Sequence, residues 1–172
     1  MAYPFERLNN LLAPLSPNSN FTPISLSIGE PKHEPPEFAL EILSDQEKMR
    51  TLLAMYPSTK GTPELRQSIS TWLKSRFSLE VDHETEILPV NGTREALFSF
   101  AQAVISDKTN PIVIMPNPFY QIYEGAALLA GASTFFCSSF ETNNYLQDFE
   151  SIPSETWKNT ELIYICLSLI HI

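Results

Sequence analysis

The spacing of hydrophobic residues changes along the chain and predicts which segments form helices and which form strands. Apolar residues recur every three or four positions at Leu65, Ile69 and Leu73, as they do on one face of a helix. Thr62 can cap this helix through its hydroxyl, and Pro63 suits the first helical position. The pattern therefore predicts a helix that begins at Pro63.

Helical and strand-like patterns alternate in the rest of the chain. We expect helices over 94–105 and 120–132, and short buried strands over 86–90, 111–116, 133–140 and 161–166. Alternation of this kind is typical of layered α/β domains in which the sheet is mostly parallel. The predicted fold class is therefore α/β, with a mostly parallel mixed sheet.

The beginning of the chain has a different character, because prolines interrupt it repeatedly. Residues 1–36 contain one short helical pattern, over 5–12, and an alternating segment, over 24–31, that is typical of an edge strand. Residues 37–54 favour an interrupted helix. We therefore expect an arm or lid over 1–36 and a compact unit from residue 37 onward.

Composition narrows the class of protein further. The chain has 172 residues, 43% of them hydrophobic, which suits one globular domain or part of a larger one. Its net charge of −9 argues against a nucleic-acid or anionic-membrane partner, since such surfaces need basic patches. We see no signal peptide and no membrane-spanning stretch, and Cys137 and Cys166 form no paired motif. We therefore expect a cytoplasmic protein.

The segment "PVNGTREALF" is the first candidate for chemistry. Asn91 and Gly92 form a tight turn after an apolar run, and a helix is predicted to start near Thr93. The unpaired N–H groups of a helix start can bind an anion, and Gly92 lets the backbone approach the ligand closely. The alternative is that this turn is only a connection between two elements.

The segment "MPNPFYQIYEGA" places three aromatic residues where a predicted strand gives way to a helix. Ligands of open α/β sheets bind at the carboxyl ends of the strands, and an aromatic ring there can stack on a planar ligand. We interpret Phe119 as a packing residue. For Tyr120 both packing and ligand stacking remain open.

The segment "SIGEPKH" suggests a contact with substrate, not a metal site. A backbone N–H at Gly29 could meet a carboxylate, whereas the three histidines of the chain are scattered without ligand spacing. We therefore expect no metal site. Neither cysteine has an activating neighbour, so we do not expect a thiol nucleophile.

Four segments in order, "SIGEP", "YPSTKGTPELR", "VNGTREAL" and "NPFYQIYEGAALLAGA", resemble fold type I, pyridoxal-phosphate-dependent aminotransferases of class I/II. The ordered set is specific and spans most of residues 24–132. "YPFERL", "SLSIGEPKH" and "YPSTKGTPELR" resemble more closely the N-terminal half of succinyldiaminopimelate transaminases. The resemblance implies pyridoxal 5'-phosphate as cofactor, amino-acid and 2-oxo-acid substrates, and a homodimer.

The resemblance also implies roles for individual residues at the cofactor. Gly92, Thr93 and Arg94 correspond to the turn whose backbone amides hold the cofactor phosphate. Tyr120 corresponds to the aromatic residue that stacks on the pyridine ring.

Two further roles concern the substrate and the partner subunit. Gly29 corresponds to the glycine that contacts the substrate α-carboxylate. Tyr56 corresponds to the tyrosine that crosses the dimer interface to the cofactor phosphate of the other subunit. This would explain why Tyr56 precedes a loop whose own sequence contains no set of catalytic residues.

Three catalytic groups of the family have no counterpart in this sequence: the lysine that bonds to the cofactor, the aspartate at the pyridine nitrogen and the arginine that clamps the α-carboxylate. None of Lys60, Lys74, Lys108 and Lys158 lies in a segment that corresponds to the motif of the cofactor-bonding lysine. We therefore expect no catalytic residue in this fragment, and we expect the fragment to be inactive.

The resemblance to this family gives a domain interpretation for the whole chain. We expect an N-terminal arm or small-domain segment over 1–36 and the first part of the cofactor-binding large domain over 37–166. After residue 166 the family continues with a turn similar to "NPTG", whereas this chain reads "LSLIHI", which we interpret as a non-native tail over 167–172. Two alternatives remain open, another class I/II amino-acid aminotransferase and a non-catalytic ligand-binding module.

Overall fold

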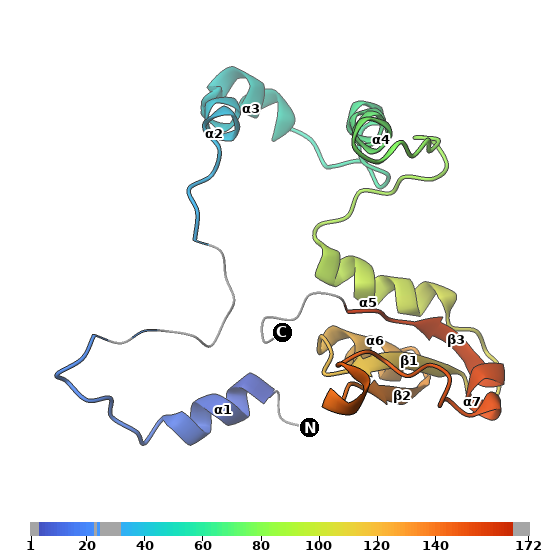
Figure 1. The fold of residues 1–172 in the computed structure, drawn as a ribbon. Helices are drawn as coiled ribbons and strands as arrows, with labels where there is room; N and C mark the ends of the chain where they lie inside the picture. The colour runs from blue at the N-terminus through green and yellow to red at the C-terminus, as the bar shows by residue number, and fades with distance from the viewer. Residues whose placement is uncertain (1–3, 23, 25–31, 167–172) are drawn as a thin grey trace. The chain divides into compact units, whose positions relative to one another are not determined.

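The structure of the protein is a computed structural model, in which residues 4–22, 24 and 32–166 are described. The chain divides into two compact units, Met1–Pro35 and Pro36–Ile172. The first unit contains helix α1 (Pro4–Leu12), so the helical pattern seen at the start of the sequence is confirmed (Figure 1). The predicted edge strand over 24–31 and the predicted tail over 167–172 lie outside the described residues.

The predicted interrupted helix over 37–54 is confirmed as two short helices. Helix α2 spans Glu37–Ser44 and helix α3 spans Gln46–Leu52. Asp45 separates them, with an extended backbone and a carboxylate that accepts a hydrogen bond from the Lys48 N–H at 3.1 Å. This is the geometry of an N-cap, so the interruption is also the start signal of α3.

Helix α4 (Pro63–Phe77) begins as the sequence predicts. The Thr62 hydroxyl accepts a hydrogen bond from the Leu65 N–H at 3.2 Å, and Pro63 occupies the first turn. The helix ends at Phe77 and is followed by Ser78, whose φ of 54° places it in the left-handed region. On the predicted apolar face, Ile69 and Leu73 are half-buried and Leu65 is 47% exposed. The buried residue of α4 is the charged Arg66.

Three parallel strands form the sheet of the second unit in the order β2-β1-β3 (Figure 1). The strands are β1 (Ile112–Asn117), β2 (Ser133–Ser138) and β3 (Thr160–Ile163). Val113, Ile114 and Met115 of the central strand are fully buried. The strands predicted over 111–116, 133–140 and 161–166 are therefore confirmed, with ends that shift by at most three residues, and so is the parallel α/β fold class.

The strand predicted over 86–90 is wrong. Residues 87–90 have no regular structure, and Leu88 and Val90 remain largely exposed. An apolar run becomes a strand only where a neighbour accepts and supplies its backbone hydrogen bonds. Within the described parts of the chain, the paired strands are β1, β2 and β3, and none of them lies beside 86–90.

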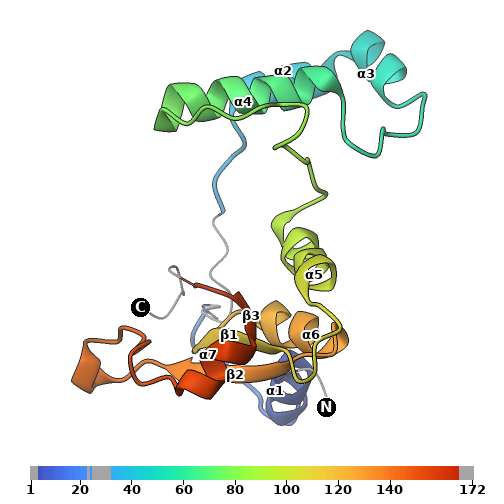
Figure 2. The same cartoon turned by 90° about the vertical axis from the view of Figure 1, so that its right-hand side faces the viewer.

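Helices α5 (Thr93–Val104) and α6 (Ile122–Leu129) pack against each other beside the sheet (Figure 2). Ala101 of α5 and Ala126 of α6 are fully buried, and their small side chains let the two helices approach closely. The Gln102 side-chain amide donates a hydrogen bond to the Ala126 carbonyl oxygen at 2.9 Å. The predicted helix over 94–105 is therefore confirmed.

The C-terminal end of α6 explains why this helix stops before residue 132, the end of the predicted range of 120–132. Gly131 has a φ of 83°, which glycine adopts without strain. The Gly131 N–H bonds to the Leu128 carbonyl and the Ala132 N–H bonds to the Ala127 carbonyl, which closes the helix in a Schellman motif. The chain then passes directly into β2.

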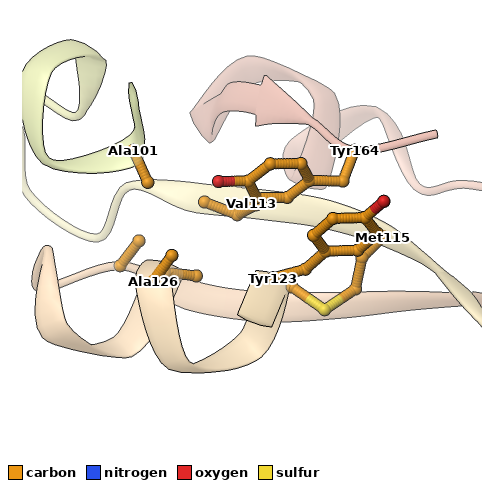
Figure 3. Packing of buried hydrophobic residues seen from close by; sticks show 8 residues of the cluster. Ala101, Val113, Met115, Tyr123, Ala126 and Tyr164 are labelled. Carbon is orange, nitrogen blue, oxygen red and sulfur yellow. The ribbon is translucent and has the colours of Figure 1, made fainter. Parts of the chain in front are cut away.

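The main buried cluster lies on the face of the sheet that α5 and α6 cover, as Figure 3 shows. It comprises Ala101, Val113, Met115, Tyr123, Ala126, Ala127, Ala132 and Tyr164. A smaller cluster of Ile114, Cys137 and Ile152 lies on the other face, because successive residues of β1 point to opposite sides. The remaining described elements are the short helices η1 (Glu141–Asn143) and α7 (Ser154–Asn159).

Candidate functional site

The turn before α5 has the backbone geometry expected of an anion-binding turn. Gly92 has φ 114° and ψ 150°, a conformation that is essentially restricted to glycine. A Cβ atom added at Gly92 would meet no heavy atom within 4 Å, so the space beside this backbone is open. No side chain caps α5, and the N–H groups of a first helical turn have no acceptor inside the helix.

Tyr120 lies next to this turn. It follows the carboxyl end of β1 by three residues and is half-buried. The Arg94 Nε donates a hydrogen bond to the Tyr120 hydroxyl oxygen at 2.8 Å. The structure thus brings together the two segments that the sequence singled out, and it does so through a contact that sequence reasoning did not anticipate.

The other aromatic residues of this region pack into the interior. The Phe119 ring stacks on the Phe136 ring with centroids 5.3 Å apart, so the interpretation of Phe119 as a packing residue is confirmed. Tyr120 meets Tyr123 edge-on at 5.8 Å. Burial, and after it the neighbouring Cys166 thiol, raises the pKa of Tyr123 to about 12. The Tyr123 phenol therefore stays neutral in any physiological buffer.

Tyr56 stands apart from these residues. It lies between α3 and α4 and is 100% exposed. Among the described residues, no hydrogen bond or ring contact joins Tyr56 to Gly92 or Tyr120. Gly29, the other residue predicted to face the ligand, lies outside the described residues.

Sequence reasoning missed Arg66, which is 4% exposed and extensively bonded. Its guanidinium donates to the carbonyl oxygens of Lys60, Gly61 and His83 and to the Glu84 carboxylate. The only signal in the sequence was its position at the end of "YPSTKGTPELR". A buried charge cannot be read from spacing when its partners are backbone carbonyls.

Two classes of site can be compared with the described residues directly. No group of three or more histidine, cysteine or acidic side chains in 4–22, 24 and 32–166 is arranged to hold a metal ion. No helix in those ranges is long and apolar enough to cross a membrane.

The sequence pattern of the family described as "Aminotransferase class I and II" matches residues 22–166. The chain belongs to this family. Its members generally depend on pyridoxal phosphate, and all four ordered segments of the sequence lie within the matched region.

Curated relatives of this aminotransferase chain include LL-diaminopimelate aminotransferases of several bacteria. The LL-diaminopimelate aminotransferase of Nitratidesulfovibrio vulgaris (strain DSM 19637 / Miyazaki F) is 32% identical over 142 residues, which cover 83% of this chain and 36% of that protein. The LL-diaminopimelate aminotransferase of Aquifex aeolicus is 32% identical over 146 residues, with the same coverage. The chain thus spans little more than a third of the length of these relatives.

Solved structures support the same fold. An aminotransferase from Neisseria meningitidis Z2491 superposes with a TM-score of 0.83 and 43% identity, covering 96% of this chain and 42% of that one. The aminotransferase AspB from Helicobacter pylori 26695 gives a TM-score of 0.81 and 33% identity, with coverages of 95% and 41%. The fold is therefore that of fold type I aminotransferases.

Proposed function

We propose that this chain is the N-terminal part of a pyridoxal-phosphate-dependent aminotransferase whose cofactor lies between the start of α5 and Tyr120. Gly92, Thr93 and Arg94 hold the phosphate, and the Tyr120 ring lies against the pyridine ring. The hydrogen bond between Arg94 and Tyr120 supports this proposal most directly, because it joins the anion-binding turn to the stacking residue at the carboxyl end of β1. The chain covers 36% to 42% of the length of these relatives, which supports the proposal that it is part of a longer protein.

The residues present fit a planar ligand that carries a phosphate. The open space beside Gly92 leaves room for a phosphate, and the positive end of the α5 dipole lies next to it. The Arg94 side chain adds a positive charge at the same turn, in a chain whose net charge is −9. When bound, the cofactor supplies an electron sink that stabilises a substrate after its α-proton is removed.

The described residues of this chain bind and orient the cofactor. The backbone of the turn fixes the phosphate. Tyr120, which accepts a hydrogen bond from Arg94 and meets Tyr123 edge-on, fixes the plane of the ring. The cofactor-bonding lysine, the aspartate and the arginine belong, in this proposal, to the remainder of the protein. Residues 37–166 are then the first part of the large domain, and residues 1–36 are an arm.

We propose N-succinyl-diaminopimelate and glutamate/2-oxoglutarate as the substrate pair, and a role in lysine biosynthesis. The names of the curated relatives support a diaminopimelate-type substrate. The succinyl group is supported only by the resemblance of "YPFERL" and "SLSIGEPKH" to succinyldiaminopimelate transaminases. Gly29 is proposed to meet the substrate α-carboxylate.

We further propose a cytoplasmic homodimer in which Tyr56 acts on the phosphate in the partner subunit. Full exposure of a tyrosine ring within its own chain supports a role at another surface. The residues that the chain itself contributes to its site, Gly92 and Tyr120, make no described contact with Tyr56.

Substitution of Gly92 tests the phosphate site in the full-length protein that carries this chain. Gly92→Ala forces a side chain onto a backbone at φ 114°, where the cost is about 1–3 kcal/mol, so the turn shifts and the dissociation constant for pyridoxal phosphate rises about tenfold. Gly131→Ala is the matched control, because it strains a glycine at φ 83° at the end of α6. Equal cofactor affinity in Gly92→Ala and wild type would refute the site.

A substrate screen tests the activity. Amino transfer to 2-oxoglutarate is measured for N-succinyl-LL-diaminopimelate, LL-diaminopimelate, aspartate, alanine and an aromatic amino acid. We expect the succinylated substrate to give the highest kcat/KM. A preference for aspartate or an aromatic substrate would favour another class I/II aminotransferase, and cofactor binding without any amino transfer would favour a non-catalytic binding module.

The 172-residue chain by itself is proposed to lack transaminase activity. None of Lys60, Lys74, Lys108 and Lys158 lies in a segment that matches a cofactor-bonding lysine. Incubation with pyridoxal phosphate, borohydride reduction and mass spectrometry should therefore give no stoichiometric adduct. A single fully modified lysine would contradict this.

A further inference from the structure

The buried guanidinium of Arg66 holds the turn that follows Tyr56. Its Nη1 donates to the Gly61 carbonyl oxygen at 2.8 Å and to the Lys60 carbonyl oxygen at 3.3 Å. The same turn is closed by the Gly61 N–H, which bonds to the Ser58 carbonyl at 3.0 Å, and by the Ser58 hydroxyl, which donates to the Gly61 carbonyl. The end of the loop that presents Tyr56 is thus fixed to α4.

The other side of the guanidinium holds a second loop. Nε donates to the His83 carbonyl oxygen at 2.9 Å, and Nη2 donates to the Glu84 carboxylate at 3.0 Å. Burying an arginine costs several kcal/mol unless its charge and donors are matched, and here hydrogen bonds leave from three of its nitrogens. Arg66 is therefore a clamp between the segments at 60–61 and 83–84.

Packing of the Pro89 ring against Gly61 extends this clamp toward the cofactor turn. A Cβ atom added at Gly61 would lie 2.9 Å from Pro89 Cγ, so the two loops touch at a point where only glycine fits. Gly61 also has a φ of 71°. Pro89 precedes Gly92 by three residues. The loop of Tyr56 and the segment that leads to Gly92 are thus packed together.

We propose that Arg66 is a positioning residue that sets the place of Tyr56 relative to the cofactor turn of its own chain. This inference rests on the proposed function of Tyr56 at the partner's cofactor. Arg66 then links Tyr56, which serves the cofactor site of the partner subunit, to the segment that leads to Gly92 in the cofactor site of its own chain. Arg66 does not itself bind substrate, because it is 4% exposed and bonded to protein groups.

A lysine cannot replace this arginine. A planar guanidinium directs donors along several fixed directions, whereas an ammonium is a compact charge that cannot span both loops. Arg66→Lys therefore keeps the charge and removes the clamp. Arg76→Lys is the matched control, because Arg76 is an exposed arginine on the same helix.

Hydrogen–deuterium exchange in the full-length protein tests the clamp. We expect backbone amides at 57–62 and 83–91 to exchange at least tenfold faster in Arg66→Lys than in wild type, with no change in Arg76→Lys. Unchanged exchange in Arg66→Lys would overturn the proposal. If Arg66→Lys does not fold, Glu84→Gln weakens the same clamp from an exposed position and should speed exchange in the same two segments.

A double-mutant cycle on cofactor affinity tests whether Arg66 acts through Tyr56. We expect Arg66→Lys to raise the dissociation constant for pyridoxal phosphate about as much as Tyr56→Phe, and the double variant to be no weaker than either single variant. If the fold-increase in dissociation constant of the double variant equals the product of the two single-variant increases, the proposal is overturned. An unchanged affinity in Tyr56→Phe alone would instead refute the proposed role of Tyr56. If Glu84→Gln replaces Arg66→Lys, the same non-additivity with Tyr56→Phe is expected.

Discussion

The rings of Tyr123 and Tyr164 lie face to face, with centroids 4.2 Å apart and planes inclined by 4° (Figure 3). This pair joins α6 to the segment after β3. The Tyr164 hydroxyl also donates a hydrogen bond to the Leu97 carbonyl oxygen of α5 at 2.6 Å. One buried side chain therefore connects α5 and α6 to the segment that follows β3.

Tyr164→Phe should destabilise the protein without disturbing the ring stack. The lost hydrogen bond is worth about 0.5–1.5 kcal/mol of unfolding free energy, because the ring still fills its place. Urea unfolding of the full-length protein measures the change. Tyr145→Phe is the control, since Tyr145 is 62% exposed and should change stability little. Equal unfolding midpoints for Tyr164→Phe and wild type would contradict the role of this bond.

Glu161 should make stability depend on acid pH. The Ser106 N–H donates to Glu161 Oε2 with a nitrogen–oxygen distance of 2.6 Å, and the Ser106 hydroxyl donates to Oε1 of the same carboxylate. The Lys108 Nζ lies 3.1 Å from Glu161 Oε1. These hydrogen bonds, the hydroxyl first, lower the pKa of Glu161 from 4.5 to about 2. A lowered folded-state pKa stabilises the protein fully above 4.5, and this contribution is lost as pH falls from about 4.5 to about 2.

The pH dependence can be measured with Glu161→Gln. Wild type should lose stability relative to this variant between pH 4.5 and 2, because the variant has no proton to bind at this position. Glu155→Gln serves as the control, since Glu155 forms an exposed pair with Lys158. Parallel curves for wild type and Glu161→Gln across that interval would show that the contact with Ser106 is not maintained.

Tyr120→Ala should weaken cofactor binding in the full-length protein, whereas Tyr120→Phe should largely keep it. The aromatic face supplies a stacking contact worth roughly 0.5–1.5 kcal/mol beyond area burial, which corresponds to a loss of about two- to tenfold in affinity. Fluorescence titration with pyridoxal phosphate measures both variants. Wild-type affinity in Tyr120→Ala would rule out the stacking role.

Tyr56→Phe should raise the dissociation constant for the cofactor by about ten- to a hundredfold. A hydrogen bond to a charged group contributes roughly 1.5–3 kcal/mol, and the phosphate would lose that bond while the ring remains. The fold should be unaffected, because Tyr56 is fully exposed in its own chain.

Mixed dimers decide whether Tyr56 acts on the partner. One lesion is Tyr56→Phe and the other is loss of the cofactor-bonding lysine of the full-length protein. With both lesions on one chain, the site that keeps its lysine is completed by the chain that carries Tyr56→Phe. That site should therefore bind cofactor weakly. With the lesions on separate chains, the site that keeps its lysine is completed by the unchanged Tyr56 of the partner. That site should therefore bind cofactor normally. The opposite pattern would place Tyr56 in its own subunit.

The sequence predicted those elements whose partners lie nearby in the chain. The β-branched run at 112–114 lies between prolines and has α6 and β2 immediately after it, so its pattern and its environment agree. The run over 86–90 is also mostly apolar, but it contains Pro89 and has no described strand beside it. Residue pattern alone does not show whether a neighbouring strand is present, which is why this strand prediction failed.

The candidate site was predictable in its residues but not in its connections. Glycine at 92 and an aromatic at 120 are recognisable because turns and strand ends need particular residue types. The bond from Arg94 to Tyr120 spans 26 positions, and the clamp by Arg66 depends on carbonyl groups that every residue carries. Such contacts follow from the path of the backbone in space.

The parallel pairing of β1 with β2 involves only the continuous stretch from 112 to 138, with α6 between the two strands. Closing so short a loop costs little chain entropy, and β3 then joins the free side of β1 soon afterwards in the sequence. During synthesis the pair of strands β1 and β2 can form while later residues are still being added at the ribosome. The strand that everything else pairs with is thus also the first of the three to emerge.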